Sequence, residues 1–168
     1  EKGVDMLLLA MKNIYRDKQF SEWKLDIFGE GPEKHQLKKM IEEYKISDKV
    51  TLKGYTSKIY DLYNNYSFLV VPSRFESFGL TIIEALKAGI PVVSFDCPYG
   101  PRRIIKHGKN GLLIEANNVE ELENGMKRMM SLESLRVKLA SNANKYLSQY
   151  DYNNVIEQWI KLFCEGVE

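Results

Sequence analysis

One segment of this 168-residue chain constrains its fold more than any other, because it combines two buried-strand patterns with an apolar helix between them. Phe68–Val71 and Val92–Phe95 are short apolar runs of the kind that form buried strands. Between them, Leu80–Ala88 has the pattern of a helix, and it is followed by Gly89 and Pro91, which end helices. A strand, a helix and a second strand with short connections predict a parallel sheet.

The rest of the chain continues this alternation. We expect further strands at Trp23–Phe28, Val50–Lys53 and Leu112–Ile114, and further helices at about Val4–Ile14, Glu33–Tyr44, Lys58–Tyr63, Val119–Met130, Leu132–Leu147 and Asn153–Cys164. Asn118 and Glu121 form a pattern that caps the start of a helix. The alternation predicts an α/β fold, with a doubly wound parallel sheet in a three-layer α/β/α arrangement.

Composition is that of one globular domain and excludes several classes. The chain is 44% hydrophobic and 28% charged, and its formal net charge of +1 gives no electrostatic reason to expect nucleic acid. No apolar run approaches the roughly 18 residues of a membrane span. Cys97 and Cys164 are too few for a disulfide framework, so we expect both to be packing residues in a reducing cytoplasm.

Two carboxylates flank the start of the central helix. Glu84 lies in the middle of this apolar segment and needs a partner, because burying an unpaired charge is costly. Glu76 lies at the turn before the helix, where the first backbone N–H groups are free to bind an anion. Open α/β sheets bind ligands at the carboxyl ends of their strands. Since carboxylates suit sugar hydroxyls and helix N-termini suit phosphates, the pattern indicates a nucleotide sugar.

The spacing Glu76-x7-Glu84, with Phe78-Gly79 after the first Glu, resembles the signature of retaining glycosyltransferases of family 4 (glycosyl transferases group 1). Other motifs that resemble this family follow in its order at Lys2-Gly3, Phe28–Pro32, Val50–Gly54, Pro72-Ser73, Ala88–Val93 and Gly108–Leu113. These enzymes have the GT-B fold. The resemblance implies that this chain is their C-terminal, donor-binding domain, the Rossmann-like half of that fold.

The resemblance also implies a domain organisation. Residues 1–168 are expected to be a single nucleotide-sugar-binding domain truncated at its N-terminus, with the N-terminal acceptor-binding domain missing, and to be inactive alone. In the GT-B family the last helix packs against that N-terminal domain. The corresponding apolar stripe here consists of Val155, Ile156, Trp159, Ile160 and Phe163.

The resemblance assigns roles to individual residues. It implies that Glu84 holds the ribose diol, that Glu76 faces the donor hexose and that Lys2 neutralises the departing diphosphate, so Glu76 and Lys2 are the expected catalytic residues. The other expected donor-binding residues are Gly29, Gly31, Phe78, Gly79, Leu80, Thr81 and Arg103. The chain departs from the family at Arg103, where many relatives have Glu.

Each of these residues also has a purely structural interpretation. Glu84 could pair with a core Lys or Arg, and Glu76 could be a solvated loop acid. Gly29 and Gly31 could be ordinary turn glycines, and Arg103 could pair with a surface acid.

The activity implied is transfer of a hexose, with retention, from a nucleotide diphosphate to an acceptor hydroxyl, UDP being the expected nucleotide. The acceptor would be a glycan or a lipid-linked sugar, in polysaccharide or glycolipid assembly. The full-length protein would work in the cytoplasm, with a peripheral position at the inner face of the cell membrane as one option. Because the sequence contains no Asp-x-Asp, we expect neither a metal nor another cofactor.

Two other classes of function stay open. A non-catalytic nucleotide-binding module would keep the Gly29–Pro32 turn without needing both Glu76 and Glu84. A sugar-nucleotide epimerase of similar architecture would need acid and base residues from the missing half.

Overall fold

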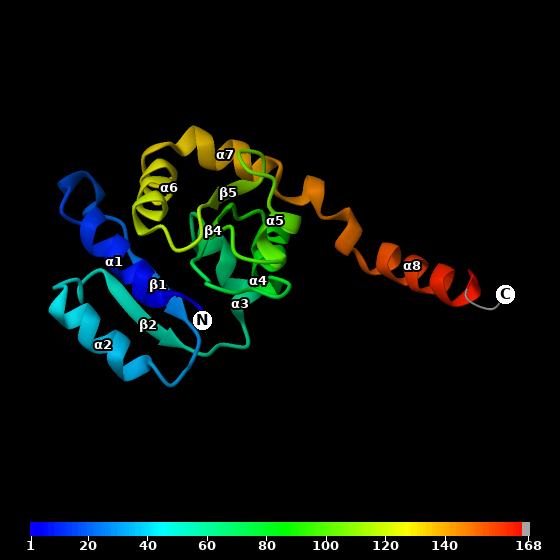
Figure 1. The fold of residues 1–168 in the computed structure, drawn as a ribbon. Helices are drawn as coiled ribbons and strands as arrows, with labels where there is room; N and C mark the ends of the chain where they lie inside the picture. Colours follow the sequence, from blue (N-terminus) through cyan, green and yellow to red (C-terminus); the bar gives the residue numbers. More distant parts are fainter. Residues whose placement is uncertain (166–168) are drawn as a thin grey trace.

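The computed structural model describes residues 1–165, in which strands and helices alternate (Figure 1). The strands are β1 (Leu25–Phe28), β2 (Val50–Gly54), β3 (Leu69–Val71), β4 (Val92–Phe95) and β5 (Gly111–Ile114). The helices are α1 (Val4–Ile14), α2 (Lys34–Glu43), α3 (Ile59–Leu62), α4 (Leu80–Lys87), α5 (Gly100–Ile104), α6 (Val119–Ser131), α7 (Glu133–Ser141) and α8 (Tyr152–Glu165). The predicted α/β class is confirmed.

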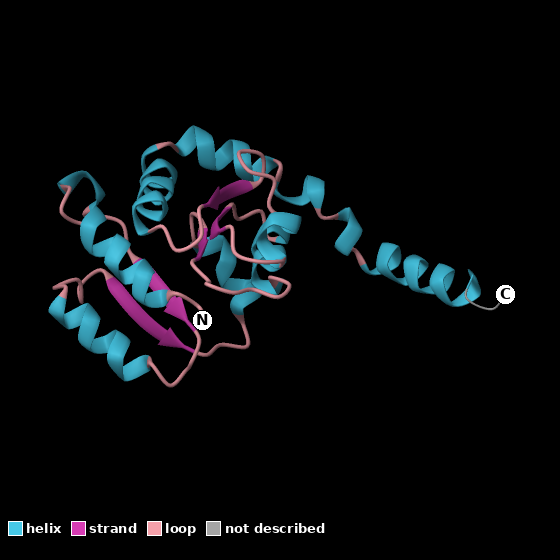
Figure 2. Cartoon of the chain, in the orientation of Figure 1, coloured by secondary structure: helices cyan, strands magenta, loops and turns pink. Residues whose placement is uncertain are grey.

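All the strand pairs in residues 1–165 are parallel, and they form two hydrogen-bonded groups. One group pairs β1 with β2, and the other has the order β3-β4-β5. Side chains link the groups: the Trp23 and Phe68 rings are 5.7 Å apart, and the Tyr66 hydroxyl donates to Asp26 at 2.8 Å. Figure 2 shows the strands between helices, as the predicted three-layer arrangement requires.

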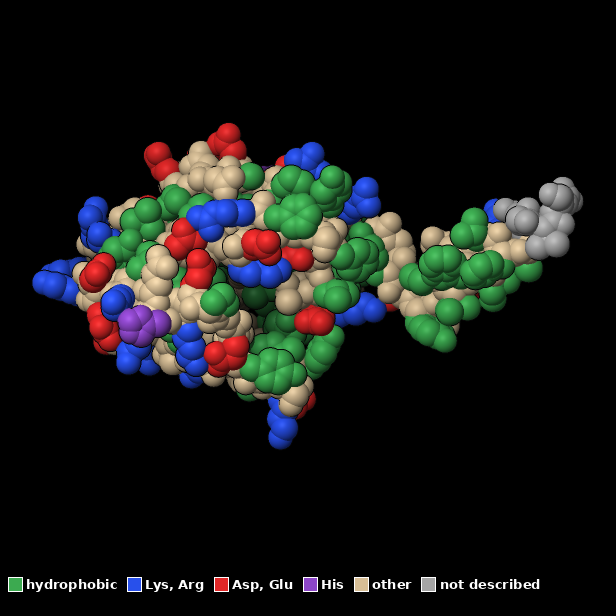
Figure 3. Space-filling model, turned by 60° about the horizontal axis from the view of Figure 1, so that its bottom comes forward, with side chains coloured by type: hydrophobic (Ala, Val, Ile, Leu, Met, Phe, Trp, Pro, Cys, Tyr) green, Lys and Arg blue, Asp and Glu red, His purple; other side chains and the backbone are tan. Residues whose placement is uncertain are grey.

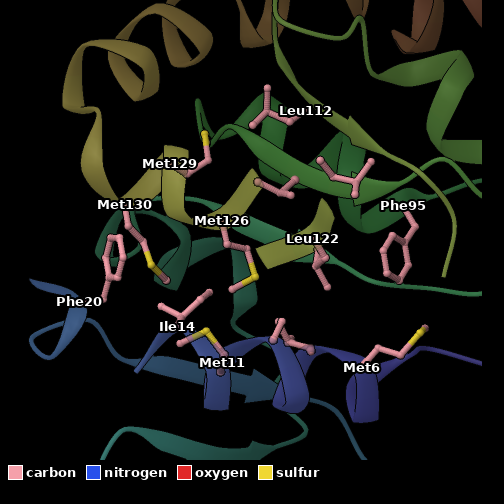
Figure 4. Packing of buried hydrophobic residues seen from close by; sticks show 14 of the residues in the cluster. Met6, Met11, Ile14, Phe20, Phe95, Leu112, Leu122, Met126, Met129 and Met130 are labelled. Carbon is pink, nitrogen blue, oxygen red and sulfur yellow. The ribbon is translucent and has the colours of Figure 1, made fainter. Parts of the chain in front are cut away.

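The face of β4 and β5 that carries the larger core is covered by α1 and α6 (Figure 4). Met11 and Ile14 of α1 face Met126 of α6, and all three side chains are almost fully buried. Apolar residues recur along both helices at the spacing of one helix face, which is why these segments form helices that pack together. Each such side chain contributes about 1.5–3 kcal/mol when it is removed from water.

The opposite face of the same sheet is covered by α4. Ile82 and Leu86 pack against Val71 of β3 and Val92 of β4. This helix keeps the bounds that the sequence predicts up to Lys87, and its carboxyl end is closed by Gly89 at a φ of 77°. The start of α4 therefore lies at the carboxyl end of β3, where the carboxylate motif was expected.

The structure differs from the sequence-based expectations at three places: the end of one helix, an additional helix and the exposure of one cysteine. The helix predicted at Leu132–Leu147 ends at Ser141, after which the chain forms short 3-10 turns. The Asn142 side-chain amide donates to the Lys138 carbonyl at 2.9 Å, so a side chain takes the place of a continuing backbone bond. Helix α5 was not expected, although Pro101 in its first turn suits a helix start. Cys164 is exposed rather than packed, whereas Cys97 is buried as predicted.

Helix α8 extends away from the rest of the molecule (Figure 1). Its apolar side chains lie along the projecting segment in the space-filling view (Figure 3), and Trp159 is 52% exposed. Within residues 1–165, no helix has both the length and the apolar character needed to cross a bilayer.

Candidate functional site

The loop between β3 and α4 places Glu76 against the segment that leads into α5. The Gly100 N–H donates to the Glu76 carbonyl at 3.0 Å, and Glu76 and Tyr99 form a parallel β-bridge. Tyr99 has a φ of 76°, which is uncommon for a residue other than glycine, and its ring contacts Phe75 edge-on. The loop that carries Glu76 is therefore held from its α5 side.

Lys2 reaches Glu76 from the start of α1. Its Nζ lies 2.7 Å from Glu76 Oε2, and the Glu76 side chain is only 13% exposed. The approach depends on Gly3, which has a φ of 66° and lies against Pro72, because a Cβ on Gly3 would be 1.9 Å from the Pro72 carbonyl oxygen. The structure thus brings the two expected catalytic residues into contact across 74 positions of sequence.

A second pair of contacts joins the same two segments. The Arg74 N–H donates to the Glu1 carbonyl at 2.8 Å, and the Arg74 guanidinium binds Asp5 through both carboxylate oxygens at 2.8 and 2.6 Å. These hydrogen bonds hold the pKa of Asp5 below its ordinary value. Sequence reasoning missed Arg74 and Asp5, because nothing local marks two residues so far apart as partners.

The start of α4 presents the expected N–H groups. Gly79 precedes the helix at a φ of 90°, and its carbonyl accepts from the Ile82 and Ile83 N–H groups. Within residues 1–165, no backbone acceptor pairs with the N–H groups of Leu80 and Thr81. A helix N-terminus with free N–H groups and no capping side chain can bind an anion.

Glu84 follows one turn after Leu80 and is partly buried. The Tyr63 hydroxyl donates to Glu84 Oε2 at 3.4 Å, and no Lys or Arg in residues 1–165 forms an ion pair with this carboxylate. The structural alternative of a core ion pair is therefore wrong for the described part of the chain. Burial, and then the Glu84 charge, raise the pKa of the Tyr63 phenol. Desolvation, and then a hydrogen bond with Glu84, raise the pKa of the Tyr60 phenol.

The glycines of the predicted turn lie at the carboxyl end of β1. Gly29 has a φ of 126°, and its N–H donates to the Gly54 carbonyl at 2.8 Å. A Cβ on Gly29 or Gly31 would have no atom within 4 Å, so the turn is open to a ligand. Phe78 is also exposed, at 50%, and packs edge-on against Tyr150.

Arg103 lies in α5 at a hollow of about 570 Å³, which it shares with Asp96, Tyr99 and Arg102. Arg102 binds both oxygens of Asp96, at 2.9 and 3.0 Å. Arg103 has no ion pair within residues 1–165. The structural alternative of pairing with a surface acid therefore applies to Arg102 and not to Arg103.

The described residues contain no cluster of three or more His, Cys, Asp or Glu side chains able to hold a metal ion. The arrangement is instead one of fixed charges: a carboxylate with a lysine at the loop, free N–H groups at the helix start and a second carboxylate one turn further. Such a row can bind a molecule that carries hydroxyl groups on both sides of a phosphate.

The chain is similar to known proteins over most of its length. The family model described as "Glycosyl transferases group 1" matches residues 1–146. The poly(glycerol-phosphate) alpha-glucosyltransferase of Bacillus subtilis is 39% identical over 169 residues, which are 96% of this chain and 25% of that relative. The poly(ribitol-phosphate) alpha-N-acetylglucosaminyltransferase of Staphylococcus aureus is 32% identical over 163 residues, covering 96% of this chain and 33% of the relative.

A crystal structure of a mutant S. aureus TarM, in complex with Fondaparinux, alpha-GlcNAc-glycerol and UDP, superimposes on the chain with a TM-score of 0.90 and 32% identity. The match covers 96% of this chain and 33% of that structure. The chain therefore spans about a quarter to a third of the length of these proteins.

Proposed function

The chain belongs to the glycosyl transferases group 1 family and has the architecture of a GT-B domain, and from this we propose that it binds the nucleotide-sugar donor of a retaining hexosyltransferase. The observation that carries the proposal is a row of three features beyond the carboxyl end of β3: the Lys2–Glu76 pair, the start of α4, and Glu84 one turn into α4.

The nucleotide would bind through its ribose and its phosphates. Tyrosine hydroxyls contact Glu84, and no described Lys or Arg forms an ion pair with it, so it can accept hydrogen bonds from the two adjacent ribose hydroxyls. The free N–H groups of Leu80 and Thr81 would bind a phosphate. UDP is the proposed nucleotide, because a solved relative that is 32% identical was crystallised with UDP.

The hexose would face Glu76. This carboxylate is held by Lys2 and by the α5 segment, so it can accept from sugar hydroxyls in a fixed position. Lys2 would stabilise the negative charge of the diphosphate as it leaves. Retention would follow from attack by the acceptor hydroxyl on the face from which the diphosphate departs. Gly29, Gly31, Phe78, Gly79 and Arg103 remain proposed donor contacts.

The acceptor would be bound mainly by a further domain. The chain covers only a quarter to a third of its relatives, and α8 exposes an apolar face that nothing in residues 1–165 covers. We infer that the full-length protein has an N-terminal acceptor-binding domain. The two relatives named above are glycosyltransferases named for poly(glycerol-phosphate) and poly(ribitol-phosphate), which favours an acceptor of polysaccharide or glycolipid assembly, a glycan or a lipid-linked sugar. We place the full-length protein in the cytoplasm or at the inner face of the membrane as part of the same proposal.

The test is nucleotide binding by the Glu84→Ala variant. Loss of hydrogen bonds to a charged group should weaken UDP binding by about 1.5–3 kcal/mol, measured by titration calorimetry. Glu123→Ala is the matched control, because its carboxylate is similarly shielded (16% exposed) but lies on α6 beside Lys127. Glu76→Ala should act on the UDP-hexose and on turnover by the full-length protein more than on UDP. UDP binding that is indifferent to Glu84→Ala would show that the ribose assignment is wrong.

A further inference from the structure

The Glu84 carboxylate is oriented by a residue that lies outside the motif. Tyr63 follows α3, and its hydroxyl donates to Glu84 Oε2. The two residues are 21 positions apart, and their contact joins α4 to the segment before β3. No Lys or Arg in residues 1–165 pairs with Glu84, so tyrosine hydroxyls orient its carboxylate: that of the buried Tyr63, and that of the exposed Tyr60, whose pKa a hydrogen bond with Glu84 helps to raise.

The core holds the Tyr63 ring in place. Tyr63 is only 5% exposed and belongs to the cluster that includes Ile83 and Leu86 of α4. The Tyr60 ring packs against it edge-on, with centroids 6.1 Å apart. A glutamate side chain rotates about three bonds, whereas a packed tyrosine ring keeps its hydroxyl at one position. The tyrosine is therefore the fixed partner and the carboxylate is the one that is positioned.

The direction of the hydrogen bond is also defined. Burial and the Glu84 charge both raise the pKa of Tyr63, so the phenol stays protonated and acts as the donor to the carboxylate. An ionised carboxylate has about four acceptor sites on its two oxygens. Tyr63 uses one site on Oε2 and Tyr60 a second site of the carboxylate, which leaves about two sites for further donors, as many as a ribose diol supplies.

We propose that Tyr63 is a positioning residue for nucleotide binding: its hydroxyl turns the Glu84 carboxylate so that both oxygens face the 2′- and 3′-hydroxyls of the ribose. This inference rests on the proposed function of Glu84. The contact of 3.4 Å is longer than most O–H···O bonds, and we expect it to shorten once ligand hydroxyls hold the carboxylate, because hydrogen bonds at a site often tighten only when the ligand is bound.

The experiment compares UDP with 2′,3′-dideoxy-UDP in the Tyr63→Phe variant. Phenylalanine keeps the buried ring and removes only the hydroxyl. UDP binding should weaken about five- to tenfold, whereas binding of the dideoxy nucleotide, which has no diol for Glu84 to hold, should stay unchanged. Thermal unfolding measured on the same samples shows whether the core is intact.

Tyr66→Phe is the matched control. It removes another partly buried phenol that donates to a carboxylate, but to Asp26 of β1, at 2.8 Å, and not to Glu84. This variant should bind both nucleotides as the unchanged chain does.

The outcomes separate this inference from the proposed function. Suppose that Glu84→Ala weakens UDP binding, but Tyr63→Phe either leaves UDP binding unchanged or weakens the binding of UDP and of the dideoxy nucleotide equally. The positioning role of Tyr63 is then overturned while the ribose assignment stands. If Glu84→Ala has no effect on UDP, the ribose assignment fails and the role of Tyr63 fails with it.

Discussion

A single glycine determines where Lys2 can lie. Gly3 has a left-handed backbone and lies against Pro72. Any other residue at this position would be strained in φ, and its side chain would overlap Pro72. The contact of Lys2 with Glu76 therefore follows from close packing of α1 on the loop after β3, rather than from charge attraction alone. Such attraction alone contributes little at a protein surface.

Gly3→Ala should separate Lys2 from Glu76 and destabilise the fold. The left-handed conformation alone costs about 1–2 kcal/mol for a residue with a Cβ, and the overlap with the Pro72 oxygen adds to it. Urea unfolding measures the loss of stability.

Gly89→Ala provides the matched control for this prediction. Gly89 has a similar φ of 77°, but a Cβ there would meet no atom within 4 Å. Gly89→Ala should lower the free energy of unfolding only by the cost of a left-handed backbone at a residue with a Cβ. Equal losses in the two variants would contradict the role of the Pro72 contact.

At the scale of elements, α5 supports the loop that carries Glu76. It is a short helix, and its entry through Tyr99 has strained backbone angles that the surrounding contacts maintain. The Gly100 N–H bond to the Glu76 carbonyl ties the start of α5 to this loop, so displacement of α5 would displace the proposed hexose contact.

Gly100→Ala should therefore weaken donor binding several-fold, because a Cβ would lie 2.5 Å from the Phe78 carbonyl oxygen and 3.0 Å from that of Glu76. Overpacking of this kind costs about 1–3 kcal/mol. Gly125→Ala in α6 is the control, since its Cβ would meet the Ile114 Cδ1 atom at 2.7 Å, away from the site. Calorimetry should show weaker UDP-hexose binding for the first variant alone. An equal loss of affinity in both would indicate a general loss of stability instead.

At the scale of the whole molecule, α8 is exposed at every residue from Tyr152 to Cys164. Ile160 and Phe163 are 57% and 67% exposed, and the Trp159 and Phe163 rings stack at 5.7 Å. An uncovered apolar face of this kind marks an interaction surface. The predicted apolar stripe is confirmed as uncovered in the described residues, and its contact with a further domain stays a prediction.

The 168-residue chain should accordingly self-associate as its concentration rises, and the full-length protein should not. The double substitution Trp159→Ser and Ile160→Ser should lower the association constant at least tenfold in sedimentation experiments, because it removes two large apolar side chains from the interface. Val137→Ser, an exposed apolar position on α7, is the control and should have no effect. A monomer at high concentration, with Trp159 fluorescence shielded from quencher, would contradict this prediction.

The order of most elements and the place of the candidate site could be predicted from the residues alone. The bounds of β4 and of α4 up to Lys87, and the Asn118 cap of α6, agree with prediction because apolar spacing and capping act within about ten residues of chain. The family motifs placed Glu76 and Glu84 at the carboxyl end of β3 for the same reason, since each motif is contiguous.

Which side chains meet depends on how the elements pack together. The Lys2-Gly3 motif marks Lys2 as a site residue but not as the partner of Glu76, and no local pattern marks Tyr63 as the partner of Glu84. The break of the predicted helix before Ala143, whose side chain is buried against the α4 face of the sheet, likewise depends on packing over a distance. Distances between remote segments follow from how whole elements pack, and no short window of sequence contains them.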